Sequence, residues 1–333
     1  MKKRILSGMR PTGPLHLGHL VGALENWAKL QEEYDCLFMV ADWHALMSEY
    51  ENTADLSGLI IDNVIDWISA GIDPRKSTLF IQSDVPEHLE LYMIFSCLTP
   101  LGWLERCPTY KEQLREVKTR NLNTYGFLGY PVLQAADILL YKADKVPVGQ
   151  DQLPHLELTR EIVRRFNSLY RIANGADKKE LFPEPEALLT KTSRLLGLDG
   201  RKMSKSYNNT IILADSAETI KKKVQNMFTD PKRIKLSDKG HPESCNVFSY
   251  YSIFADGIKN EVHDWCVNAK VGCTECKKNF SRELIEKLKP LQEKRKELVK
   301  DKIKVKNILA QGAEKAKASA SKTIKEAREV MKI

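Results

Sequence analysis

Apolar stretches of strand length alternate with stretches of helical periodicity through the first half of this 333-residue chain. The pattern predicts strands at 3–7, 35–41, 77–82 and 146–148, and helices at 17–28, 56–70, from 86 onward, 131–141 and 151–166. Asp84 is expected to cap the helix that begins at Pro86 and Glu87. Strands joined by single helices imply right-handed crossovers. The sequence therefore predicts an α/β protein with a parallel sheet, whose ligands bind at the carboxyl ends of the strands.

The second half of the chain differs in pattern and charge. Loops are predicted at 171–185 and 197–209, and the rest is helical in pattern except for a polar segment at 230–243. Residues 277–333 hold 18 Lys and Arg against 8 Asp and Glu, whereas the whole chain has a net charge of +8. Such a basic end can bind a polyanion or form a solvated helical surface, and charge alone leaves both open.

Composition excludes several classes of protein. Hydrophobic residues make up 42% of the chain and charged residues 29%, as in globular proteins. No apolar stretch reaches the ~18 residues of a membrane span, and no apolar segment follows the basic start as in a signal peptide. Seven cysteines, an odd number, do not fit a secreted disulfide framework. These features predict a cytoplasmic protein without a membrane partner.

An H-x-G-H motif follows the first predicted strand. His16 and His19 lie three residues apart, so both can face one ligand from the start of a helix, and Gly18 leaves the backbone open to a ring or phosphate. The free N–H groups and the helix dipole favour anions there. Taken alone, the motif also fits ordinary surface or zinc-binding histidines.

A basic motif follows Gly200 in the second predicted loop, with the sequence Lys202-Met203-Ser204-Lys205-Ser206. Two lysines three residues apart can neutralise the charge that builds on a leaving pyrophosphate, and the two hydroxyls add donors. A basic loop by itself is usually only solvated, so the interpretation depends on the H-x-G-H motif as well.

Together and in this order, the two motifs resemble the signatures of class I aminoacyl-tRNA synthetases. The segments 7–13, 130–139, 146–152 and 155–161 extend the match over most of the chain, which resembles the tryptophanyl-tRNA synthetase family. The resemblance implies a Rossmann-type parallel-sheet catalytic domain at 1–210, with a dimer-forming segment at about 85–145. It also implies a helical C-terminal domain at 211–333 that binds the tRNA anticodon.

The resemblance further implies the reaction. A homodimer activates L-tryptophan with ATP and Mg²⁺, releases pyrophosphate, and passes tryptophan to the 3′ end of tRNA(Trp). The first step is an in-line displacement that depends on positioning and charge neutralisation.

Site residues are carried over by position. Asp137 matches the carboxylate that accepts the indole N–H of tryptophan, and the other tryptophan-site positions are Gln152, His44, Tyr130, Gln134 and Leu6. The ATP-site positions are Arg10, Pro11, Thr12, Gly18, His19, Gly149, Gln150, Asp151, Leu195, Lys202, Met203, Ser204, Lys205 and Ser206. The catalytic positions are His16, His19, Lys202, Lys205 and Lys111. The chain departs from many bacterial members, which carry Gln at position 10 and Met at position 134.

Side-chain chemistry alone leaves alternatives open. An aspartate in an apolar cleft accepts from an indole N–H or from a phenol O–H, so a tyrosine-type synthetase is not separated from a tryptophan one. An H-x-G-H nucleotidyltransferase that does not act on tRNA leaves the basic end and the segment around Asp137 unexplained. A non-catalytic RNA-binding or iron-sensing paralogue is expected to have lost His19, Lys202 or Lys205, and all three are present.

Four cysteines cluster near the start of the basic end, at Cys245, Cys266, Cys273 and Cys276. Four thiolates can hold zinc or an iron–sulfur cluster, and spacing alone does not decide. The set resembles the motif of a subset of tryptophanyl-tRNA synthetases, which implies a [4Fe-4S] cluster near the anticodon-binding region. The other cysteines, Cys36, Cys97 and Cys107, are interpreted as small apolar residues.

Overall fold

A five-stranded parallel sheet forms the centre of the computed structural model, which describes residues 2–117, 120–170, 172–174, 177–189, 195–201, 203 and 207–333. The strands lie in the order β3-β2-β1-β4-β7. Their bounds are β1 Arg4–Met9, β2 Asp35–Val40, β3 Ser77–Ile81, β4 Lys145–Val148 and β7 Glu186–Leu189. The expected α/β fold is confirmed, and the strand order reverses between β1 and β4.

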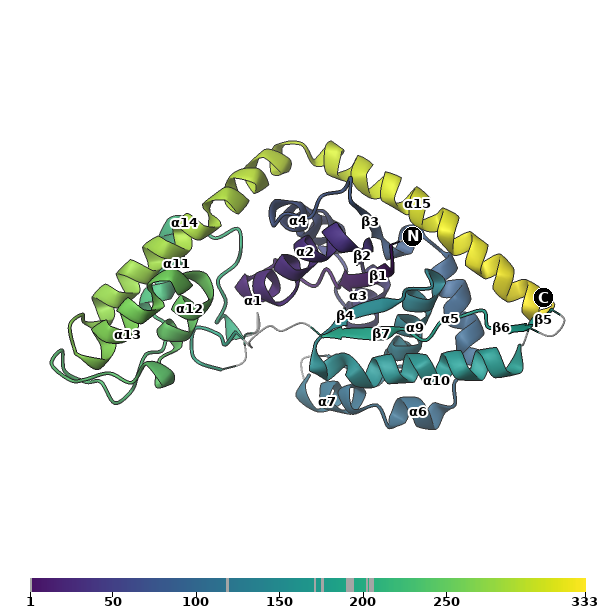
Figure 1. Cartoon of the computed structure of the whole chain (residues 1–333), viewed down its shortest axis with the longest axis horizontal. Coiled ribbons are helices and arrows are strands. Elements are labelled where there is room, and N and C mark those ends of the chain that lie inside the picture. The colour runs from purple at the N-terminus through teal and green to yellow at the C-terminus, as the bar shows by residue number, and fades with distance from the viewer. Residues whose placement is uncertain are drawn as a thin grey trace.

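Helices cover both faces of this sheet (Figure 1). They are α1 Leu17–His19, η1 Leu20–Leu24, α2 Glu25–Glu33, α3 Asp42–Glu49, α4 Leu56–Ser69, α5 Glu87–Leu98, α9 Tyr130–Leu140 and α10 Leu153–Leu169. Alternate residues of one strand face opposite cores. On β1, Ile5 packs in the core that contains Trp67 of α4, whereas Leu6 packs in the core that contains Leu139 of α9.

Two local predictions were wrong. Asp84 does not cap α5: it ends the short 3-10 turn η2 Gln82–Asp84, and Pro86 takes the cap position without a side-chain hydrogen bond. The polar segment 171–185 is not only loop, because β5 Ile172–Asn174 and β6 Asp177–Lys179 pair antiparallel within it. The connection from β3 to β4 also contains three short helices between α5 and α9: α6 Leu101–Glu105, α7 Pro108–Glu116 and α8 Tyr125–Leu128.

The chain after the second signature is helical, as expected. A group of helices stands beside the sheet domain in Figure 1, made of α11 Ala217–Gln225, α12 Asn246–Phe254, α13 Lys259–Val267 and the first part of α14 Cys273–Lys300. In the described part of the chain, no helix has the length and apolar character needed to cross a membrane.

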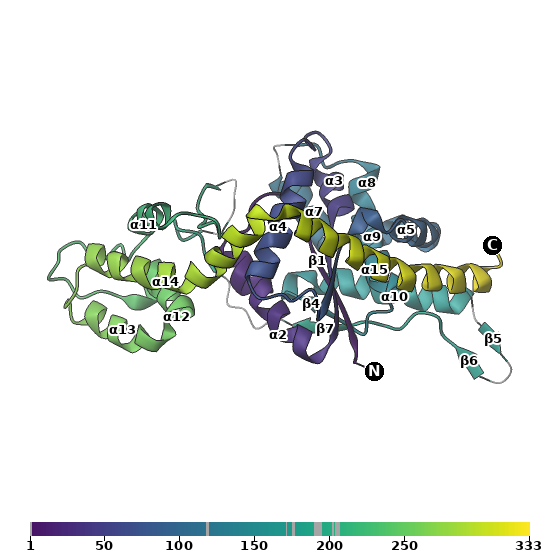
Figure 2. The ribbon, with the colours of Figure 1, turned by 90° about the horizontal axis from the view of Figure 1, so that it is seen from above.

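The last helix, α15 Lys302–Met331, returns along the sheet domain (Figures 1 and 2). It packs on β3, the edge strand, through a face of small residues that includes Gly312, Ala316 and Ala320. A Cβ on Gly312 would lie 1.7 Å from the Leu79 carbonyl oxygen, so glycine is required for this close approach. The helix thereby covers a sheet edge that would otherwise be open to pairing with another strand.

Candidate active site

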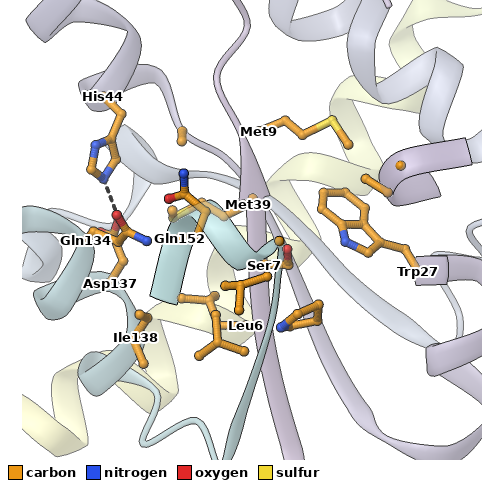
Figure 3. A pocket seen from close by; sticks show the side chains of 18 residues that line it. Leu6, Ser7, Met9, Trp27, Met39, His44, Gln134, Asp137, Ile138 and Gln152 are labelled. Carbon is orange, nitrogen blue, oxygen red and sulfur yellow. Dashed lines mark hydrogen bonds and ion pairs between the residues drawn. The ribbon is translucent and has the colours of Figure 1, made fainter. Parts of the chain in front are cut away.

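A cavity of about 340 Å³ opens where the strand order reverses, at the carboxyl ends of β1 and β4 (Figure 3). Its walls are mainly apolar side chains and strand backbone. The lining residues are Leu6, Ser7, Gly8, Met9, Gly22, Ala23, Trp27, Met39, Ala41, His44, Gln134, Asp137, Ile138, Val146, Pro147, Val148, Gly149 and Gln152. Five of the six residues expected at the tryptophan site therefore meet in one cavity.

Asp137 is the buried charge of this cavity, with 3% of its surface exposed. Its Oδ1 accepts hydrogen bonds from Gln82 Nε2 at 2.8 Å and from His88 Nδ1 at 2.7 Å. Its Oδ2 lies 2.8 Å from His44 Nε2 (Figure 3). Burial raises the pKa of Asp137, but the bonds from His44 and His88 lower it below its usual value. The carboxyl is consequently held ionised, as an acceptor.

The support behind Asp137 was missed by sequence reasoning. His88 is fully buried on α5, and its Nε2 lies 2.8 Å from the Tyr141 hydroxyl. Gln82 follows strand β3 directly. The sequence offered one signal for this pair: Gln82 follows a parallel strand, and His88 lies in the first turn of the next helix.

Tyr130 does not line the cavity. It lies at the start of α9, and its hydroxyl is 2.7 Å from His155 Nε2. His155 also contacts Thr109 Oγ1 at 3.1 Å. Tyr130 is thus part of a hydrogen-bond network that joins α9, α10 and the start of α7.

The H-x-G-H segment forms a capped helix start. The His16 ring Nδ1 accepts from the Gly18 N–H, and the His19 ring Nδ1 accepts from the His16 N–H, each at 3.1 Å. The two ring centroids are 3.9 Å apart. The π-helical turn η1 follows at once and brings Gly22 and Ala23 to the cavity wall. Both imidazoles therefore sit together at a helix N-terminus beside the cavity.

The two signature segments meet in space. Of the second motif, Lys202, Ser204, Lys205 and Ser206 lie outside the described residues, and Met203 lies within them. A Cβ on Gly18 would come within 3.0 Å of Met203 Sδ and 2.9 Å of the His16 ring. Leu17 N donates to Ile211 O at 3.0 Å and Leu213 N to Leu15 O at 2.9 Å, which pairs the two stretches of backbone.

The other expected ATP-site residues are spread around this region. Gly149 lines the cavity, and Gln150 and Asp151 form an exposed 3-10 turn, η3 Gln150–Gln152, directly after it. Arg10 and Thr12 are exposed and Pro11 is buried, between β1 and the capped helix start. Leu195 lines a different hollow, near Cys245. Lys111 is exposed on α7 in a further hollow formed by that helix.

The four clustered cysteines converge near the junction of α13 and α14. All four are free and half-buried. Burial raises the pKa of Cys276, and the nearby Cys245, Cys273 and Cys266 raise it further, to about 12. Within the described residues, however, no group of three or more His, Cys, Asp or Glu side chains is arranged to hold a metal ion. The sulfur atoms are gathered but not set as a preformed metal site.

The parallel sheet, its crevice and the paired signature segments define the catalytic fold of the class I aminoacyl-tRNA synthetases. The family described as tRNA synthetases class I (W and Y) matches residues 1–289. The chain belongs to this family.

Individual relatives agree with this assignment. The chain is 49% identical to the tryptophan–tRNA ligase of Thermotoga maritima, with 99% of each chain covered. It is 41% identical to that of Ralstonia nicotianae, covering 99% of this chain and 98% of the relative. The structure of Campylobacter jejuni tryptophanyl-tRNA synthetase complexed with ADP and tryptophan superposes with a TM-score of 0.88, at 34% identity, over 99% of this chain and all of the other.

Proposed function

We propose that this chain is a tryptophan–tRNA ligase. It joins the carboxylate of L-tryptophan to the α-phosphate of ATP, releases pyrophosphate, and transfers the aminoacyl group to the 3′ end of tRNA(Trp). The observation that carries the proposal is Asp137, a buried acceptor in the wall of an otherwise mainly apolar cavity. An aromatic side chain with a single N–H donor matches these walls.

Amino-acid recognition rests on Asp137 and the residues around it. The carboxylate accepts the indole N–H, and Leu6 and Ile138 contact the faces of the ring. His44 holds the Asp137 carboxylate at the indole end, and Gln134 and Gln152 supply polar groups of the cavity lining for the α-amino and α-carboxylate groups. An analogue without the donor leaves Asp137 short of a partner, and polar sites of this kind reject such analogues by ~10⁴–10⁵.

ATP lies against the helix start that His16 and His19 cap. Backbone N–H groups and the helix dipole favour the phosphates there, and Gly18 permits their close approach. Arg10, Pro11 and Thr12 flank the triphosphate, whereas Gly149, Gln150 and Asp151 flank the ribose. Lys202 and Lys205, with Lys111, neutralise the leaving pyrophosphate. Mg²⁺ bound together with ATP would neutralise part of the phosphate charge.

Exchange of pyrophosphate into ATP, measured with each of the twenty amino acids in turn, tests the reaction. Tryptophan is expected to support exchange far better than any other amino acid. Asp137→Ala is expected to weaken tryptophan selection strongly and to leave ATP binding largely intact, since the interactions that it removes, with the indole and with His44, His88 and Gln82, all lie at the tryptophan site. Preference for tyrosine would instead identify a tyrosine-type enzyme, and no exchange with any amino acid would contradict the proposal.

The chain acts in the cytoplasm as a homodimer whose contact lies within 85–145. The support is a set of exposed large apolar side chains on α5, α6 and α8: Met93, Leu101 and Tyr125. Large apolar side chains that are exposed together can form an interaction surface, and these three lie in the segment expected to form the dimer. Light scattering of the purified chain is expected to give a dimer, and Met93→Glu with Tyr125→Glu is expected to give a monomer.

Residues 1–210 carry activation, and 211–333 carry the tRNA-binding surface and a cluster site. The donor set fits iron and sulfur: Cys245, Cys266, Cys273 and Cys276 are all thiols, with Arg233 Nη1 4.0 Å from Cys273 Sγ to balance thiolate charge. These four residues would hold a [4Fe-4S] cluster. The cluster would crosslink the segments around α13 and α14 that carry the cysteines, next to the proposed tRNA-binding surface.

Metal analysis of anaerobically purified protein tests the cluster. About four iron and four sulfide per chain are expected, and Cys276→Ser is expected to lose them while tryptophan activation is spared. Cys97→Ser, outside the set, is the matched control. One zinc per chain would replace the iron–sulfur assignment with a zinc site.

A further inference from the structure

One turn of α14 reaches from the helical region to the catalytic body through two side chains. Gln292 Nε2 donates to the carbonyl oxygens of Leu213, at 3.0 Å, and Asp215, at 2.9 Å. Arg295 Nε donates to Asp66 Oδ1 on α4 at 2.7 Å. The Arg295 contact reaches the sheet domain directly, whereas the Gln292 contact reaches the 211–215 backbone, which pairs with Leu15 and Leu17 of the sheet domain.

The Arg295 contact continues to the H-x-G-H segment. The Asp66 side chain is only 3% exposed, and the Leu15 backbone N–H also faces its carboxyl. Leu15 directly precedes His16, the residue that caps the helix start. A single buried carboxyl therefore bridges α14 to the backbone that places both imidazoles.

The Gln292 contact continues to the same point from the other side. The segment it holds follows the second signature, and Leu213 N donates to Leu15 O at 2.9 Å. Both contacts of α14 thus lead to Leu15. Arg295 reaches the Leu15 N–H through Asp66, and Gln292 reaches the Leu15 carbonyl oxygen through Leu213. Neither Gln292 nor Arg295 lines the cavity.

We propose that Arg295 and Gln292 are positioning residues for adenylate formation, which hold the two signature segments in register through Asp66 and the 211–215 backbone. The inference rests on the proposed tryptophan activation. Small displacements of groups that surround reacting phosphates cost up to about 10²-fold in rate. Loosening this brace should therefore slow the chemical step more than it weakens tryptophan binding, because Asp137, His44 and Gln152 lie on α9, α3 and η3 and not on the braced segments.

The test compares Arg295→Met with Lys302→Met in the full-length protein. Lys302 Nζ lies 3.7 Å from Asp62, one turn before Asp66 on the same helix, so it is a matched contact between α4 and the C-terminal helices that does not lead to Leu15. We expect Arg295→Met to lower the rate constant of tryptophan activation about tenfold to hundredfold. Tryptophan Kd is expected to stay within twofold, and Lys302→Met to behave as wild type. Arg295→Lys should recover part of the rate, because it restores a cation beside Asp66.

Gln292→Leu provides a second variant in case Arg295→Met does not fold, because it leaves the Asp66 pair intact. It is also expected to slow activation and spare tryptophan binding. Equal rates for Arg295→Met and Lys302→Met, or a matching loss of tryptophan affinity, would overturn the positioning role. Absence of tryptophan-dependent activation in the wild-type protein would instead contradict the proposed function itself.

Discussion

The pKa values of two buried aspartates in this protein shift in opposite directions, and the groups that face each carboxyl account for the difference. Burial raises the pKa of both. At Asp137, the hydrogen bonds and charges of His44 and His88 outweigh burial, and the pKa falls below its usual value. At Asp66, burial outweighs the bonds from Arg295 and the Leu15 N–H, and the pKa rises to about 6. A single ion pair rarely offsets the desolvation of a buried carboxyl.

The raised pKa of Asp66 predicts a specific dependence of stability on pH. Because its pKa is about 6 in the folded state and 3.8 as the reference, the folded protein binds the proton more tightly. Its contribution is fully present below the unfolded pKa and is lost as pH rises through the folded pKa. Between pH 5 and pH 7.5 we expect it to fall by about 1.4 kcal/mol. Urea unfolding of wild type and Asp66→Asn at both pH values measures it, since only wild type carries this group. An equal pH response in the two proteins would contradict the raised pKa.

The donors behind Asp137 predict a graded loss of tryptophan affinity. His88→Leu removes one charge-assisted hydrogen bond to the carboxylate, which is worth about 1.5–3 kcal/mol, so tryptophan Kd should rise. Tyr141→Phe removes only the hydroxyl 2.8 Å from His88 Nε2 and should have a smaller effect. Calorimetric titration with tryptophan measures both, and ATP binding serves as the internal control. Unchanged tryptophan affinity in His88→Leu would show that Asp137 needs no support from α5.

At the scale of elements, periodicity predicted the strands and helices that bury one clear face. β2 was found because its apolar run is continuous, and α4 because its pattern is helical and stops at Gly71, whose φ of +108° is left-handed. β7 was missed because Glu186–Leu189 has no alternating pattern, and it becomes a strand only by pairing with β4. Likewise, the family resemblance indicated Asp137, but nothing in the sequence shows that Gln82 and His88 converge on it across the sheet.

The close contact of α15 with β3 predicts that Gly312 cannot be enlarged. Gly312→Val would force the helix away from the Leu79 carbonyl and uncover the edge of β3. Overpacking of this kind costs about 1–3 kcal/mol in the free energy of unfolding. Gly58→Ala in α4 is the matched control, because no atom lies within 4 Å of the added Cβ and alanine favours a helix by about 1 kcal/mol. Thermal unfolding of both variants is the measurement, and a Gly312→Val protein as stable as wild type would contradict the close packing.

At the scale of the whole molecule, the basic C-terminal end is part of the packing of the sheet domain. The apolar face of α15 is part of the sheet domain's core, since Ala316, Ala320 and Ala327 are buried there. Arg328 and Lys142 also pair across this contact with Glu90 and Glu326. Removal of α15 would therefore disturb the fold together with any RNA contact. The proposed tRNA surface is better tested by single charges on exposed positions.

The exposed lysines of α14 predict a salt-dependent contribution to tRNA binding. Lys287 and Lys289 are exposed on α14 next to the group of helices that holds the four cysteines. Each lysine that neutralises a phosphate contributes about 0.7–0.9 to the slope of log affinity against log salt. Lys287→Gln with Lys289→Gln should therefore weaken tRNA(Trp) binding and lower this slope by up to about 1.8, while tryptophan activation is unchanged. Lys322→Gln with Lys325→Gln, at the far end of α15, removes the same charge away from these helices and should change the slope little. Filter binding of tRNA over a range of salt concentrations distinguishes the two pairs, and equal slopes for both would show that net charge, and not a tRNA surface on α14, sets the affinity.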